Sequence, residues 1–145
     1  MKSAADGPLF IGYGNALLGD DGAGAYVAAS LRRRGLNAIA VPQLTPELAD
    51  LLCRVEVAIF IDANAALRPG EMSITPLREA GHSLFEHEIS PAGLLRLVRE
   101  VYHRAPDSLL INLGARSCEL GAPLSTAIRR AAREAVNFCV QFRGL

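Results

Sequence analysis

Residues 12–24 read GYGNALLGDDGAG, and they stand between the apolar run PLFI at residues 8–11 and a weakly amphipathic run at residues 26–31. An apolar run, a glycine-rich turn and an amphipathic run predict a strand, a tight loop and a helix. Glycine lets the backbone turn sharply at the end of a strand and approach a ligand closely. The segment therefore predicts a loop that presents a binding site.

The two adjacent carboxylates of this loop, Asp20 and Asp21, decide what kind of ligand it suits. A phosphate-binding loop places amide donors, and no negative charge, at the start of a helix. The spacing also departs from the dinucleotide fingerprint, because Leu17 stands where the third glycine belongs. We interpret the loop as a turn that presents carboxylates and suits a cation.

Composition restricts the class of protein. The chain has 145 residues, 50% of them hydrophobic, which predicts a single domain over residues 1–145. With 15 basic and 15 acidic residues and no basic stripe, we expect no nucleic-acid partner. The absence of a long apolar run predicts no membrane partner. Cys53, Cys118 and Cys139 are widely spaced, which favours reduced thiols and a cytoplasmic protein. We expect a monomer.

Strand and helix patterns alternate along the chain. A mostly parallel twisted sheet of about five strands, with helices on both faces, is therefore predicted: a three-layer α/β/α fold. The helix over residues 46–52 is expected to begin at the cap Thr45, and the next helix at the cap Ser90. Val101 and Tyr102 are placed on the apolar stripe of the latter. The expected strands are 9–12, 38–41, 55–61, 72–77 at an edge, and 108–113, and the remaining helices are 21–34 and 124–140.

In parallel sheets, ligands bind beyond the carboxyl ends of the strands. Asp21 follows the first strand, Asp62 and Asn64 end the third, and residues 114–116 follow the last. We therefore expect these residues on one rim. Asp62 also has a simpler interpretation, as a strand-end aspartate that caps a turn.

Two histidines compete for a role at this rim. His87 lies in HSLFEHEIS, immediately before the predicted helix, in the loop layer where functional residues concentrate. His82 is the second candidate, beside Gly81. His103 ends a helix, where a cation is favoured by the dipole, so we assign it a structural role.

Asp21, Asp62 and His87 together would form a site of two oxygen ligands and one nitrogen ligand. Imidazole suits nickel, zinc, copper and iron, and carboxylates add harder donors. Three protein ligands with an open position are typical of a reactive metal site rather than a closed structural one.

Four blocks of the chain resemble the nickel–iron hydrogenase maturation endopeptidases. They are GYGNALLGDDGAG, IFIDAN, HEIS followed by Pro91 and a Leu94-Leu95 helix, and the stretch from Leu113-Gly114 to GAPLS at residues 121–125. The resemblance spans about residues 9–135. Many family members carry glutamate at the position of Asp21, and a Pro-Glu pair in the loop that reads ARSCELGAP here.

The resemblance implies an endopeptidase that removes the C-terminal extension of a nickel-loaded hydrogenase large-subunit precursor. It implies that Asp21, Asp62 and His87 contact nickel brought by that substrate and serve as the catalytic residues. Zinc or cadmium is expected to occupy the same site. Alternatively, Asp21 or Asp62 acts as a general base on water. The rival hypothesis is a non-catalytic α/β module that binds a small molecule or nucleotide through the glycine turn.

Overall fold

The structure, a computed structural model, describes residues 7–78 and 88–144. Its sheet has five strands in the order β2-β1-β3-β5-β4. Four of them are parallel, and β4 runs antiparallel to β5 at one edge. The strands are β1 (Leu9–Tyr13), β2 (Ala38–Val41), β3 (Val57–Asn64), β4 (Met72–Leu77) and β5 (Asp107–Gly114).

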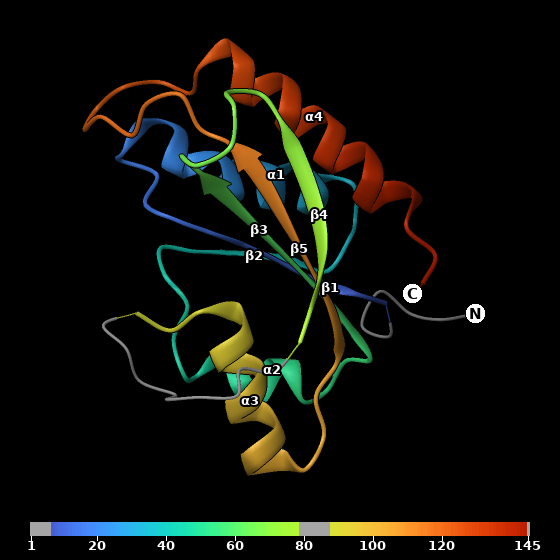
Figure 1. The fold of residues 1–145 in the computed structure, drawn as a ribbon. Coiled ribbons are helices and arrows are strands. Elements are labelled where there is room, and N and C mark those ends of the chain that lie inside the picture. The colour runs from blue at the N-terminus through green and yellow to red at the C-terminus, as the bar shows by residue number, and fades with distance from the viewer. Residues whose placement is uncertain (1–6, 79–87, 145) are drawn as a thin grey trace.

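Helices cover both faces of this sheet, which confirms the predicted α/β/α fold. Figure 1 shows α1 and α4 on one side of the strands and α2 and α3 on the other. No helix among the described residues is long and apolar enough to cross a membrane. The helices are the 3-10 turn η2 (Gly19–Gly22), α1 (Ala23–Arg33), α2 (Leu48–Leu52), α3 (Pro91–Tyr102) and α4 (Thr126–Gln141).

The strand sequences are apolar on both faces because each face meets a helical layer. In β3, Ile59 and Ile61 pack with the α1 and α4 residues, whereas Ala58 and Phe60 pack with α2 and α3. All four side chains are fully buried. Continuous apolar runs of this kind are typical of parallel strands covered on both sides.

The chain order creates a crevice between β1 and β3. From β1 the chain passes through α1 to β2 on one side, and then through α2 to β3 on the other side of β1. Because α1 and α2 lie on opposite faces, the carboxyl ends of β1 and β3 are left open between them. This is the topological switch point at which ligands bind in open α/β sheets.

Some predicted element boundaries were wrong. The first helix starts at Ala23, not Asp21, because residues 19–22 form a 3-10 turn. The second helix starts at Leu48, and Thr45 is not its cap: its carbonyl accepts from the Leu48 amide at 3.1 Å in a preceding turn.

The predicted cap of α3 is confirmed, but its predicted stripe is too long. The Ser90 hydroxyl accepts a hydrogen bond from the Gly93 amide at 3.0 Å, and Pro91 occupies the first turn. Val101 and Tyr102, at the carboxyl end of the helix, are instead 55% and 38% exposed.

Backbone packing fixes α1 against the end of β1. A Cβ atom on Gly12 would overlap the carbonyl oxygen of Gly24. The close approach brings the start of α1, and the turn before it, onto the carboxyl ends of the central strands. Only glycine permits this contact.

Gly12→Ala is expected to lower the free energy of unfolding by at least about 3 kcal/mol, because backbone must move to admit the methyl group. The control is Gly35→Ala, where φ is 82° but no atom lies within 4 Å of an added Cβ. Left-handed strain alone should cost that variant about 1 kcal/mol. Urea unfolding measures both, and equal losses would contradict the packing explanation.

Candidate active site

A cleft of about 670 Å³ opens at the switch point, and Asp21 and Asp62 both line it. Tyr13 at the end of β1 and Glu88 before α3 also contribute to its wall. The segment that follows β2, residues 42–46, lines it as well. Two of the three predicted site residues are therefore brought together, from positions 41 residues apart in the sequence.

Asp62 is a carboxylate held in a partly buried place. It lies near the end of β3, beyond Ile61, which pairs with Gly12 of β1. Burial raises the pKa of Asp62 to about 6, and the negative charge of Asp21 adds to the increase. A hydrogen bond with Tyr13 opposes it. Asp62 thus changes its protonation state close to neutral pH.

Tyr13 is the site residue that sequence reasoning missed. Burial raises the pKa of its hydroxyl above the ordinary value of 10, and the charge of Asp62 and their hydrogen bond raise it further. The phenol therefore stays neutral and donates to Asp62. Its place follows from the register of the two strands, because Tyr13 and Asp62 come directly after Gly12 and Ile61, which pair across β1 and β3.

Asp21 is presented to the cleft by the glycine turn. Its Oδ2 atom accepts a hydrogen bond from the Asn15 amide at 2.6 Å. Gly14 has a φ of 136°, and a Cβ there would overlap the carbonyl oxygen of Asp21. The loop of residues 14–18 can therefore fold tightly over η2 and hold the carboxylate at its edge.

Asp20 does not share this role, contrary to the expectation that both aspartates suit a cation. Its side chain is 1% exposed and accepts hydrogen bonds from the Arg116 amide at 2.8 Å and from the Ser125 amide and hydroxyl at 2.7 Å each. Burial by itself raises the pKa of Asp20, but these hydrogen bonds outweigh it and hold the pKa below its ordinary value of 3.8. Asp20 is a structural residue.

His87 and its competitor His82 lie outside the described residues. The residue after His87, Glu88, lines the cleft. Within residues 7–78 and 88–144, no group of three His, Cys, Asp or Glu side chains could hold a metal ion. Of the three predicted ligands, the described residues therefore include only the two carboxylates, Asp21 and Asp62.

The other residues predicted on the rim form hydrogen bonds within the loops around the cleft. Asn64 accepts a hydrogen bond from the Ala66 amide at 2.8 Å, which caps the turn after β3. Arg116 contributes its backbone amide to Asp20, as described above. Neither side chain lines the cleft. His103 forms the left-handed end of α3 with φ 59°, and Cys139 is buried in the core.

Solved structures of other proteins share this architecture. The NiFe hydrogenase maturation protease HybD from Thermococcus kodakarensis is 26% identical, with a TM-score of 0.74 over 92% of this chain and 97% of that one. The structure of the present chain is therefore similar to those of the NiFe hydrogenase maturation proteases. HybD from E. coli matches with a TM-score of 0.73 at 21% identity, over 91% of this chain and 88% of its own, and this likeness supports the fold alone. No protein-family model matches the chain, and no curated protein matches its sequence.

The maturation-protease likeness confirms the resemblance derived from the sequence blocks. A third structure, the maturation protease HycI from T. kodakarensis, matches at 22% identity with a TM-score of 0.70, over 92% of this chain and 90% of that one. Each of the three likenesses spans nearly the whole of both proteins.

The two adjacent aspartates should respond differently to the same substitution. Asp20→Asn replaces an acceptor oxygen with an amide that faces N–H and O–H donors, so it should lower the free energy of unfolding by about 2–4 kcal/mol. Asp21→Asn keeps an oxygen for the Asn15 amide and should change it by less than about 1 kcal/mol. Urea unfolding at pH 7 tests this pair, and equal losses would show that Asp20 has no special structural role.

The hydrogen bond from Tyr13 should control the titration of Asp62. Tyr13→Phe removes a donor to the ionised form, so the pKa of Asp62 should rise above its value of about 6. Tyr26→Phe, on the exposed face of α1, is the matched control and should leave that pKa unchanged. Carboxyl-carbon NMR titration measures both, and an unaltered pKa in Tyr13→Phe would refute the assigned hydrogen bond.

The raised pKa of Asp62 also sets a dependence of stability on pH. Since the folded pKa lies above the unfolded one, the folded state binds the proton more tightly. The contribution of Asp62 is then complete below about pH 4 and is lost as the pH rises through 6. Asp62→Asn should therefore gain about 1–3 kcal/mol relative to the wild type between pH 4 and pH 7. A constant difference in urea unfolding across this range would contradict the assignment.

Proposed function

We propose that this protein is an endopeptidase that removes the C-terminal extension of a hydrogenase large-subunit precursor. The observation that carries the proposal is the meeting of Asp21 and Asp62 at the switch point of a sheet. The chain as a whole has the fold of a maturation protease to which it is 26% identical. The proposed partner is the precursor alone, and the proposed enzyme is a cytoplasmic monomer that forms one domain over residues 1–145.

We propose that nickel reaches the cleft as part of the substrate and contacts Asp21, Asp62 and His87. Electrostatics supports a cation there, because Asp21, Asp62 and Glu88 line the cleft and none of its described lining residues is a lysine or an arginine. A positive ion would relieve the repulsion that contributes to the raised pKa of Asp62. Carboxylate and imidazole donors together fit a divalent ion of the nickel or zinc kind.

The bound ion can serve in two ways, as a recognition element for a correctly loaded substrate and as a Lewis acid on the scissile carbonyl. A water molecule must then attack that carbonyl. In the metal-independent form of the proposal, Asp62 is suited to accept the proton of that water, because a pKa of about 6 leaves it largely ionised at neutral pH yet basic enough to bind the proton.

The rival function of nucleotide binding is disfavoured by the same charges. Phosphate groups in this cleft would meet two carboxylates at the glycine turn and the end of β3. No basic side chain lines the described wall to compensate.

Asp21→Asn should reduce cleavage of a nickel-loaded precursor by at least about 100-fold, because the loss of one charged ligand weakens the shared ion. Asp21→Glu should retain part or all of the activity, since its carboxylate can still reach the ion. Asp107→Asn, an exposed aspartate at the start of β5, is the matched control and should cleave normally. Loss of the C-terminal extension is followed by mass spectrometry. Wild-type cleavage by Asp21→Asn would reject a charged role for this residue.

A further inference from the structure

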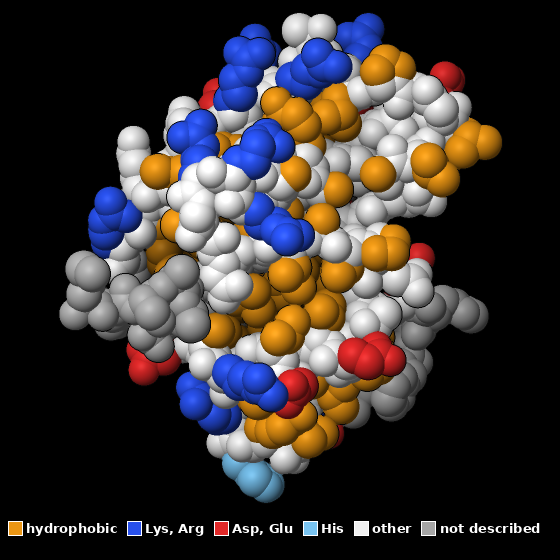
Figure 2. All heavy atoms as spheres, turned by 180° about the vertical axis from the view of Figure 1, so that it is seen from behind, with side chains coloured by type: hydrophobic (Ala, Val, Ile, Leu, Met, Phe, Trp, Pro, Cys, Tyr) orange, Lys and Arg blue, Asp and Glu red, His pale blue; other side chains and the backbone are white. Residues whose placement is uncertain are grey.

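Charge is distributed unevenly over this chain, although its net charge is zero. The layer formed by α1 and α4 carries one acidic residue, Glu134, and six arginines. In Figure 2 most of the basic side chains on this face lie over the part of the molecule where α1 and α4 lie, and the others lie lower, beside acidic ones. The arginines are Arg32, Arg33 and Arg34 at the end of α1, and Arg129, Arg130 and Arg133 on α4.

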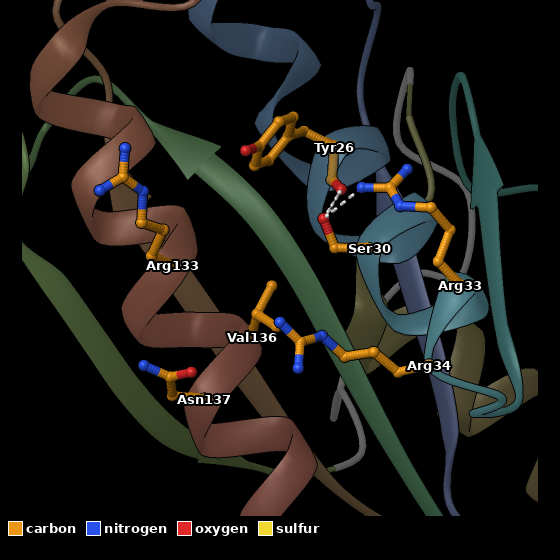
Figure 3. Close-up of a pocket in the computed structure, with 7 residues that line it drawn as sticks. All are labelled: Tyr26, Ser30, Arg33, Arg34, Arg133, Val136 and Asn137. Atoms are coloured by element: carbon orange, nitrogen blue, oxygen red, sulfur yellow. Dashed lines mark hydrogen bonds between the residues drawn. The ribbon is translucent and has the colours of Figure 1, made fainter.

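A groove of about 510 Å³ lies between these two helices, far along α1 from Asp21. Arg33, Arg34 and Arg133 line it, and no carboxylate is among its lining residues. Figure 3 shows Arg34 extending from the end of α1 toward Val136 on α4, with Arg133 on the α4 wall. Three guanidinium groups thus face one groove from two helices.

Hydrogen bonds and apolar surface shape this groove. One Arg33 nitrogen donates to the Ser30 hydroxyl at 3.2 Å, and that hydroxyl donates to the Tyr26 carbonyl at 3.1 Å (Figure 3). Val136 is buried, while Tyr26 is 38% exposed. The ion pairs found among the described residues, Arg54–Asp50 and Arg96–Glu100, belong to α2 and α3 on the other layer.

We propose that this groove binds an acidic segment of the protein substrate, at a docking site separate from the cleft. The inference rests on the proposed function for the identity of the partner. Guanidinium groups form paired hydrogen bonds with carboxylates, and charge complementarity governs encounter and orientation. The partly exposed Tyr26 side chain adds apolar surface that suits a polypeptide chain.

The groove does not have the helix N-terminus that many phosphate sites use. Here Ser30, Arg33 and Arg34 lie at the carboxyl end of α1, where the backbone presents carbonyl groups and the helix dipole is negative. Side chains alone supply the positive charge, in an open groove.

The spacing allows one substrate to occupy both sites. The 11 residues of α1 rise by about 16 Å between the turn that presents Asp21 and the arginines at its end. A folded precursor could thus dock its acidic surface on the groove while its C-terminus enters the cleft. Binding at two places raises the affinity without any change in the chemical step.

The test compares two double variants with the same change in charge. Arg33→Glu/Arg133→Glu alters the groove, and Arg32→Glu/Arg129→Glu alters exposed arginines of the same helices that do not line it. The groove variant should raise the KM for the precursor about ten-fold with kcat retained, and the control less than about two-fold. Sodium chloride at about 0.5 M should reduce the difference. Equal effects in the two variants, or none, would overturn the proposal.

Binding measurements separate this proposal from the proposed function. Precursor binding is measured for the wild type and both double variants by fluorescence anisotropy, whether or not cleavage occurs. Failure of the wild type to cleave, with binding lost only in the groove variant, would reject the endopeptidase and keep the docking site. Cleavage by the wild type, together with unaltered binding in the groove variant, would reject the docking site and keep the endopeptidase. An octaglutamate peptide should compete for the groove, and an octaglutamine peptide should not. Stronger competition by inorganic phosphate would overturn the assignment to carboxylates.

Discussion

The buried carboxylate of Asp20 is the interaction on which the site depends. It joins the turn after β1 to residues that follow β5, about 100 positions later in the chain, through the amides of Arg116 and Ser125. The Ser125 hydroxyl donates to the same carboxylate and accepts from the Ile128 amide, so the start of α4 is fixed by it as well. Two loops at the carboxyl edge of the sheet are thereby held in one position.

This anchoring separates the tasks of two neighbouring residues. Asp20 turns inward and satisfies its oxygens with backbone and hydroxyl donors, whereas Asp21 lines the cleft with Asp62. The buried residue gives the rigidity that a binding site requires, and its neighbour keeps the charge available for a ligand. The close contact of Gly12 with Gly24 also packs the start of α1 directly against the end of β1.

The sequence predicted the sheet and the rim because both follow from local patterns. VAIF at residues 57–60 is apolar on both faces of a strand, and Asp62 follows it. The different roles of Asp20 and Asp21 could not be predicted, because the donors to Asp20 are 96 to 105 residues away. The contribution of Tyr13 required the register of β1 against β3. The helix over 46–52 was predicted too long because Pro46 and Glu47 form a separate turn.

The central claim is that Asp21 and Asp62 share a cation at the switch point of the sheet. Anomalous diffraction from crystals soaked with cadmium tests it without a substrate. The account predicts one strong peak between the two carboxylates, and its loss in crystals of Asp62→Asn. A peak at another place, or a peak between these positions that persists in Asp62→Asn, would contradict the account.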